Sequence, residues 1–214
     1  MSKLSKRHFW EWFKRHQKEY IGLNKMPKKE AAYWLSEMTA HLRSYFKSFG
    51  FSLTLHENQA ATLTITVNGK AKHFKRVEAF VATAPEIPGW TVRTLEDPMP
   101  VDFLLNKQME EAGIDPREFY FSFASDHPEA GIIVYHPLCT EENKHVLAQL
   151  AYAAVYNLLG ERSFGLDIGN VEVDNLSSAD DDDEIQKLEE LTAAVAARRS
   201  SMIVDDQGRL LDMD

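Results

Sequence analysis

The sequence of 214 residues has little cysteine and no long hydrophobic run, and each shortage excludes a class of protein. A single cysteine, Cys139, cannot form an internal disulfide framework or a metal site built from several thiolates. Nowhere do about 18 apolar residues follow one another, so no membrane-spanning helix is expected. The basic start leads into no apolar segment of the kind that a secretory signal contains. We therefore expect a cytoplasmic protein that does not enter a membrane.

Motifs that bind cofactors and metals are also missing. The ten glycines are scattered and form neither a GxGxxG nor a GxxxxGKS/T loop, so no nucleotide cofactor is expected. The eight histidines form no HExxH or HxH pair, and His8 and His16 lie too far apart on one helix to share an ion. No GxSxG turn is present, and Glu141 and Glu142 would oppose a thiolate at Cys139. The sequence thus predicts no cofactor and no metal.

Charge is distributed unevenly along the chain. Residues 1–76 carry 15 Lys and Arg against 5 Asp and Glu, whereas residues 77–214 carry 9 against 28. This asymmetry indicates either a basic face that binds a partner or attraction between the two halves of the chain.

The first 50 residues are expected to form a helical hairpin. Gly22 to Asn24 interrupt the helical pattern, and Pro27 suits the first turn of a second helix. Gly50 is expected to end that helix. The two apolar stripes contain Phe9, Trp12, Phe13, His16 and Tyr20, and then Ala31, Leu35, Met38, Leu42, Tyr45 and Phe49.

Beyond residue 50 the pattern alternates between strands and helices. Period-2 alternation predicts strands at residues 51–55, 62–67, 90–95, 119–123, 132–135 and 168–173. Period-3.6 stripes predict helices at residues 73–84, 141–160 and 185–199. The stretch 98–116 is ambiguous between a strand and a helical turn at 106–112. The end of the chain, residues 202–211, fits either a small hairpin or a flexible tail.

This order of elements favours an α+β fold, with an N-terminal helical hairpin followed by a mainly antiparallel sheet that has helices packed on one face. We expect three segments. Residues 1–50 form the hairpin, which packs on the main domain; residues 51–176 form the α+β sheet domain; and residues 177–214 form an acidic helix and tail.

The acidic run from Asp180 to Glu184 lacks the glycine and the final glutamate that an EF-hand loop needs. We expect the run to precede a helix that ends in Arg198 and Arg199, because charges of these signs complement the helix dipole. Ser178 or Asp180 is then the candidate N-cap.

Two motifs stand out. The first is Phe9-Trp10-Glu11-Trp12-Phe13, and the second is Ala84-Pro85-Glu86-Ile87-Pro88-Gly89-Trp90. In these motifs the chain resembles a family of uncharacterised bacterial proteins that share an FWxWF helix, a strand hairpin and an APxxPGW turn. The resemblance covers residues 5–176 and supports the predicted order of elements. It implies no activity, because none is known for the family.

A binding role is the function that the sequence favours, and whether the chain is an enzyme stays open. No pair of titratable residues lies at a spacing that local geometry would bring together for catalysis. We therefore expect a protein-protein interaction or regulatory module with a protein partner. Candidate binding residues are Trp10, Lys14, Lys70 and Lys72. A homodimer is compatible with an exposed Trp10.

Two other functions remain as alternatives. A nucleic-acid-binding protein would use the basic N-terminal helices, with Trp10 stacking on bases. A hydrolase-type enzyme would assemble its site from distant segments, with Asp126, His127 and His136 as the residues to watch.

Overall fold

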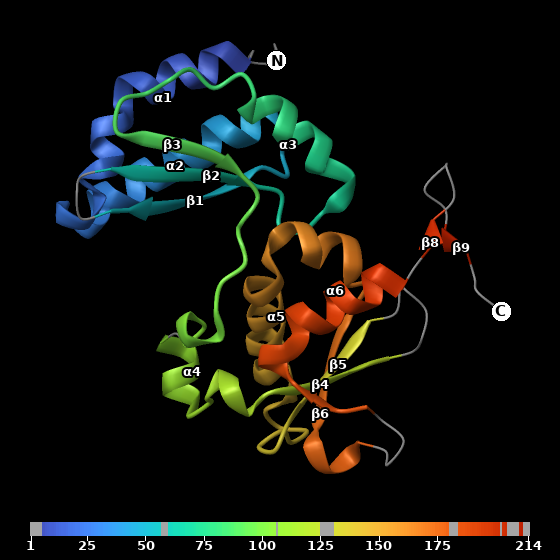
Figure 1. Cartoon of the computed structure of the whole chain (residues 1–214). Coiled ribbons are helices and arrows are strands. Elements are labelled where there is room, and N and C mark those ends of the chain that lie inside the picture. The colour runs from blue at the N-terminus through green and yellow to red at the C-terminus, as the bar shows by residue number, and fades with distance from the viewer. Residues whose placement is uncertain are drawn as a thin grey trace. The chain divides into compact units, whose positions relative to one another are not determined.

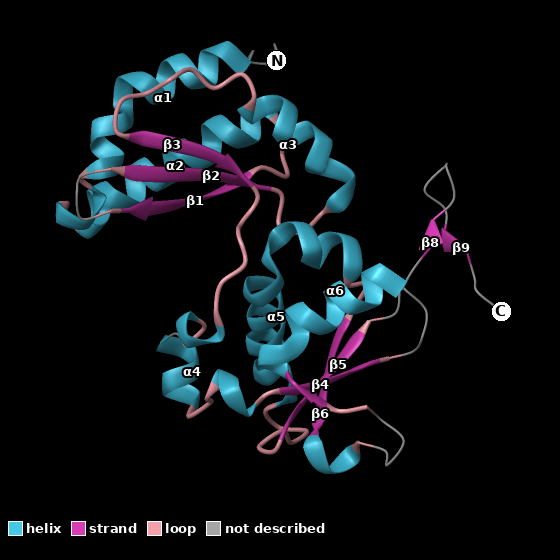
Figure 2. Cartoon of the chain, in the orientation of Figure 1, coloured by secondary structure: helices cyan, strands magenta, loops and turns pink. Residues whose placement is uncertain are grey.

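The structure is a computed structural model that describes residues 6–56, 60–105, 107–124, 131–179, 184–201, 203–204 and 210–211. The chain divides into two compact units, residues 1–96 and residues 97–214, which we call unit 1 and unit 2 (Figure 1). Both units contain helices and strands, so the predicted α+β class is confirmed (Figure 2). The predicted sheet is in fact two sheets, of three and four strands, with a separate two-stranded ribbon. The division between the units falls inside residues 51–176, the segment predicted as one sheet domain.

Unit 1 begins with the predicted helical hairpin. Its elements are α1 (Lys6–Ile21), α2 (Lys28–Tyr45), β1 (Gly50–Leu55), β2 (Ala61–Thr66), α3 (Phe74–Val81) and β3 (Trp90–Thr94). Strand β1 pairs with β2 antiparallel, and β2 pairs with β3 parallel. Gly50 begins β1 and does not end α2, because the chain already turns to extended backbone at Phe46.

One face of the unit 1 sheet forms the core. Leu63 and Ile65 are fully buried on that face, and Phe13 of α1, Leu42 of α2 and Val77 of α3 belong to the same cluster. The helices therefore cover one face, as predicted. The opposite face carries polar side chains such as Ser52, Thr64 and Arg93, which are neighbours across the three strands.

Unit 2 is built around a second sheet. Its elements are α4 (Lys107–Ala112), β4 (Tyr120–Phe123), β5 (Ile132–His136), α5 (Lys144–Asp167), β6 (Val171–Asn175), β7 (Gln186–Lys187), α6 (Leu191–Ser201), β8 (Ile203–Val204) and β9 (Leu210–Leu211). The sheet order is β6-β5-β4-β7, with β5 and β6 parallel and the other pairs antiparallel. Short 3-10 turns occur in the two units at Leu23–Lys25, Ala71–His73, Val101–Phe103, Pro116–Glu118, Leu176–Ser178 and Leu188–Glu190.

Two helix boundaries in unit 2 differ from the prediction. Gly160 leaves helical geometry with φ 68°, as its predicted role as a stop requires, but the helix resumes and ends at Asp167. Helix α6 begins at Leu191, because Gln186 and Lys187 form β7. Ser178 is therefore not the N-cap of this helix; its hydroxyl donates to the Asn175 carbonyl at 2.6 Å. Asp180 lies outside the described residues. The tail forms the small hairpin, β8 with β9, that was one of the two expectations.

The two units share one topology. In each, an antiparallel hairpin is followed by a helix that returns the chain to a parallel strand beside the second strand of the hairpin. This ββαβ arrangement is β1-β2-α3-β3 in unit 1 and β4-β5-α5-β6 in unit 2.

Candidate binding site

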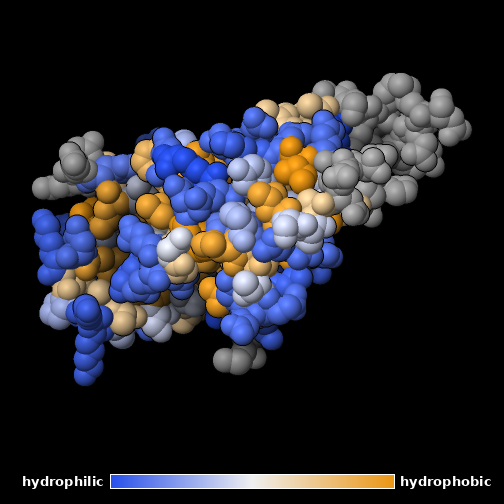
Figure 3. Space-filling view, turned by 90° about the horizontal axis from the view of Figure 1, so that it is seen from below, coloured by the Kyte–Doolittle hydropathy of each residue, from blue (hydrophilic) through white to orange (hydrophobic). Residues whose placement is uncertain are grey.

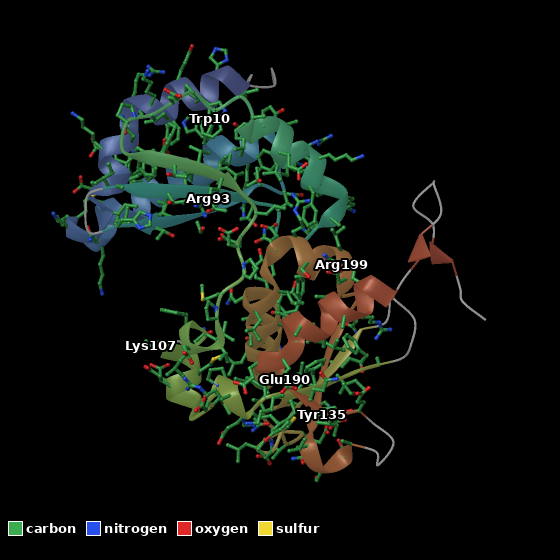
Figure 4. The ribbon with its side chains drawn as sticks, in the orientation of Figure 1. Trp10, Arg93, Lys107, Tyr135, Glu190 and Arg199 are labelled. Atoms are coloured by element: carbon green, nitrogen blue, oxygen red, sulfur yellow. The ribbon has the colours of Figure 1, made fainter. Side chains whose placement is uncertain are left out.

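Trp10, the aromatic candidate from the sequence, is buried. Its side chain is 2% exposed, packs on Phe80 with 5.1 Å between ring centroids, and donates from Nε1 to Thr83 Oγ1 at 3.2 Å. The predicted exposure of Trp10 is therefore wrong. Helix α1 is covered on two sides, because Trp12 packs on His41 of α2 while Trp10 faces α3. Figure 4 shows Trp10 on the inner side of α1, so it does not offer a ring to bases or to a second copy.

The three candidate lysines are exposed. Lys14 lies on the outer side of α1, whereas Lys70 and Lys72 lie in the segment that leads into α3. The structure thus brings Lys70 and Lys72 together with their neighbours Lys75 and Arg76, and Lys14 belongs to a different element. We call Lys70, Lys72, His73, Lys75 and Arg76 the basic patch.

Local structure explains why the cations of the basic patch point outward. Asn68 and Gly69 both have positive φ and form the tight turn that ends β2. The Asn68 N–H donates to Thr66 Oγ1 at 3.0 Å, which holds the turn. Phe74 and Val77 are buried in the core, so helical spacing leaves Lys75 and Arg76 on the exposed side.

An aromatic side chain that the sequence analysis missed supports the basic patch. The Arg76 guanidinium lies 4.3 Å from the centroid of the Phe46 ring, and the His73 ring meets Phe46 edge-on at 4.8 Å. Phe46 also contacts Phe49, at 5.2 Å. No sequence signal marks Phe46, because the helical stripe through Tyr45 and Phe49 does not include it.

The basic patch has an uncompensated positive charge. Within the described part of the chain, no ion pair involves Lys70, Lys72, Lys75 or Arg76. Burial lowers the pKa of His73, and the neighbouring Lys72, Arg76 and Lys70 lower it further. Unit 1 as a whole carries 16 Lys and Arg against 8 Asp and Glu, and unit 2 carries 8 against 25. The positive charge of the chain is therefore concentrated in unit 1.

A second cluster of polar side chains lies where β5 and β6 end, at the start of α5. His136 is fully buried there, and its Nδ1 accepts from the Leu138 N–H at 3.1 Å. Its Nε2 has no hydrogen-bond partner in the described structure and lies 3.8 Å from Glu118 Oε2. Burial lowers the pKa of His136, and Glu118 opposes this shift. Because Nδ1 accepts from the Leu138 N–H, the proton of the neutral ring lies on Nε2.

The loop around Cys139 is closed by its own hydrogen bonds. Asn175 Nδ2 donates to the carbonyls of Cys139 at 2.6 Å and Pro137 at 3.2 Å. Thr140 and Asn143 bond reciprocally, from the Thr140 N–H to Oδ1 at 2.8 Å and from the Asn143 N–H to Oγ1 at 3.4 Å. Cys139 is 3% exposed, and burial raises the pKa of its thiol. These residues anchor α5 to the sheet, and the buried thiol is not an activated nucleophile.

Two further candidates from the sequence, Asp126 and His127, lie outside the described residues. In the portion that the structure describes, no group of three or more His, Cys, Asp or Glu residues could hold a metal ion. Large apolar side chains are exposed at Phe103, Leu138 and Leu166, at 71%, 52% and 59%. On the face drawn in Figure 3, hydrophobic side chains lie in separate areas among hydrophilic ones.

Comparison with protein-family models, with curated proteins and with solved structures finds no match. The resemblance to the FWxWF family therefore stays a prediction. Among the helices of the described residues, none combines the length and the apolar character that crossing a membrane requires.

Proposed function

We propose that the chain is a protein-binding module whose unit 1 takes an acidic partner through the basic patch. The observation that carries this proposal is the group of four exposed cations within seven residues, none of which has a counter-ion in the described structure. Charges of one sign held on rigid elements raise the rate at which an oppositely charged partner associates, and they exclude partners of like charge.

A partner that is a protein fits the surroundings of the basic patch. The Phe46 ring is covered on one side by Arg76 and at its edge by His73, so the patch offers charge and a limited aromatic surface. Unit 2 carries many more acids than bases, so it adds no binding surface for a long polyanion such as DNA.

Nucleic acid is a second candidate, because one observation favours it. The Arg76 guanidinium lies over the Phe46 ring, in a segment that also carries three exposed lysines, and aromatic and guanidinium groups with cations nearby bind single-stranded bases and phosphates. Trp10, the ring expected from the sequence to stack on bases, is buried and cannot contribute.

The proposal is tested with charge-reversal variants of the full chain. The patch variant is Lys70→Glu/Lys72→Glu/Lys75→Glu, and the matched control is Lys25→Glu/Lys28→Glu/Lys29→Glu, with the same change in net charge on other exposed lysines of unit 1. The probes are a polyglutamate peptide and a single-stranded DNA of equal charge, followed by fluorescence anisotropy over a range of salt concentrations.

We expect the patch variant to bind polyglutamate at least about tenfold more weakly than the control, which corresponds to about 1.4 kcal/mol. Equal loss in both variants would show that only net charge matters and would overturn the proposal. Binding to DNA that is tighter than binding to polyglutamate at every salt concentration, and that the patch variant loses, would replace the proposed function with the nucleic-acid one.

A further inference from the structure

Strand β1 is an edge strand without the usual protection of edges. The sheet order of unit 1 is β1-β2-β3, and within the described part of this unit β1 pairs with β2 alone. Its six residues, Gly50 to Leu55, include no charged side chain and no proline. Edge strands normally carry such residues, bulges or a cover, because a bare row of backbone donors and acceptors binds other strands.

The register shows which backbone groups of β1 point away from the sheet. The His56 N–H donates to the Ala60 carbonyl at 2.9 Å, and this pair continues the β1–β2 register. In an antiparallel ladder bonded pairs alternate with unbonded ones. Ser52 and Thr54 are therefore bonded to β2, whereas Phe51, Leu53 and Leu55 direct N–H and C=O outward.

In unit 2 the corresponding edge of the sheet is paired with a further strand. Strand β4 corresponds to β1, and it is paired on its outer side with β7, antiparallel, with Tyr120 opposite Lys187 and Phe121 opposite Gln186. The Leu188 N–H donates to the Phe119 carbonyl at 3.0 Å, and Phe119 and Phe121 are core residues, as Phe51 and Leu53 are core-facing in β1. The ββαβ topology thus accepts an antiparallel strand on this edge.

The basic patch lies at the Gly50 end of the open edge. Phe46, which contacts Arg76 and His73, also packs on Phe49, the residue before β1. A Cβ atom on Gly50 would lie 3.6 Å from Nδ2 of Asn68, the turn residue two positions before Lys70. A strand added to β1 would therefore bring one of its ends to the cations.

We propose that an extended segment of the acidic partner adds to β1 as an antiparallel strand, with acidic residues C-terminal to the strand and against the basic patch. This inference rests on the proposed function and names the partner's conformation and direction. Antiparallel pairing runs the added strand from the Leu55 end to the Gly50 end, so its C-terminal side meets Lys70 and Lys72. Backbone hydrogen bonds supply affinity, and the charge supplies direction.

Two synthetic peptides of identical composition test the direction. Each is an alternating Thr-Val strand, with a Glu-Asp-Glu run after it in one peptide and before it in the other. We expect the full chain to bind the first peptide at least about tenfold more tightly. Hydrogen exchange on this complex should slow at the amides of Phe51, Leu53 and Leu55, and not at Ser52 and Thr54, which are already bonded to β2.

A backbone variant isolates the edge from the charge. Leu53→Pro removes one outward N–H, and Leu53→Val keeps it with a similar loss of apolar contact. Proline should abolish the preference for the first peptide, and valine should keep it; tryptophan fluorescence checks that unit 1 is folded. If the proline variant does not fold, the exchange pattern of the wild-type chain decides alone.

The outcomes separate this inference from the proposed function. Peptide binding that needs the basic patch but leaves β1 exchange unchanged would overturn strand addition and leave the proposed function standing. Absence of binding to either peptide, while polyglutamate still binds through the basic patch, would overturn strand addition alone; loss of both would overturn both. A dimer in sedimentation experiments that Leu53→Pro removes would assign the edge to a second copy and overturn the peptide as its occupant.

Discussion

Units 1 and 2 place the same ββαβ topology in opposite surroundings. Unit 1 has twice as many bases as acids, and unit 2 has about three times as many acids as bases. The first strand of the hairpin is open in unit 1 and covered by β7 in unit 2. Both units adopt this topology despite these differences. The pattern of buried positions therefore determines the topology, whereas the surface charge and the pairing of the edge strand can differ between units.

The cores of the two units differ as well. The unit 1 cluster is dominated by aromatic rings, among them Phe9, Trp10, Phe13 and Phe80. The unit 2 cluster is mainly aliphatic, with α5 supplying residues such as Leu147, Leu150, Val155 and Leu158. In unit 1, a few large aromatic side chains fill the space between three helices and a three-stranded sheet. In unit 2, the long helix α5 contributes many smaller apolar side chains to the core.

The largest effect that tests this comparison is the loss of stability when a core residue of one unit is replaced. Phe80 is fully buried and contacts the rings of Phe9, Trp10, Tyr45 and Phe49. Phe80→Ala should lower the free energy of unfolding by about 3–5 kcal/mol, through lost contacts and the cavity left behind. All four tryptophans lie in unit 1, so tryptophan fluorescence follows that unit.

Phe121→Ala is the matched control, since Phe121 is equally buried in the core of unit 2. It should lower the transition measured by circular dichroism and leave the fluorescence transition in place. If both variants moved the fluorescence transition equally, the two units would unfold as one, and the comparison between them would fail.

Much of the fold follows from local patterns. Alternation predicts β1, β2, β4 and β5, and helical stripes predict α1, α2 and α3, because one buried face imposes a period of 2 or 3.6 on the sequence. The same patterns do not reveal that β3 and β6 pair parallel to their neighbours, since alternation does not identify the partner of a strand. The two-residue β7 is too short to produce a pattern.

Only part of the candidate site could be predicted from the sequence. The lysines at 70 and 72 are exposed and clustered, as their density along the chain indicates. Trp10 deviates from the main stripe of α1, yet it is buried because α3 covers a second side of the helix, and only tertiary packing reveals this. The open edge of β1 depends on which strands pair, so it too required the structure.

A smaller effect concerns acid, because each unit contains a histidine whose pKa is lowered by burial. Burial lowers the pKa of His136 in unit 2 and of His41 in unit 1; Glu118 opposes the first shift, Glu37 opposes the second, and His16 adds to the second. A folded-state pKa below the unfolded value of about 6.5 means that protons bind the unfolded chain better. Stability is therefore complete above that pH and is lost as pH falls below it.

Variants assign this acid sensitivity to its unit. His136→Asn keeps an acceptor for the Leu138 N–H and should flatten the loss of stability between pH 7 and pH 5 in circular dichroism. His41→Phe keeps the stack on Trp12 and should flatten it in tryptophan fluorescence. The first effect should be larger, because His136 is fully buried and the His41 side chain is 30% exposed. Unchanged pH profiles in both variants would contradict this assignment.

The smallest effect probes the charge of unit 1 at a single residue. Burial is the first cause of the low pKa of His73, and Lys72 is the first of its charged neighbours to lower it. Lys72→Glu replaces a repelling charge with an attracting one, so the His73 pKa should rise, which a proton NMR titration of the imidazole measures. Stability should change by less than about 0.5 kcal/mol, because Lys72 is exposed. Lys28→Glu makes the same change in net charge at the start of α2. If it raised the His73 pKa as much, the positive field would belong to unit 1 as a whole and not to the basic patch.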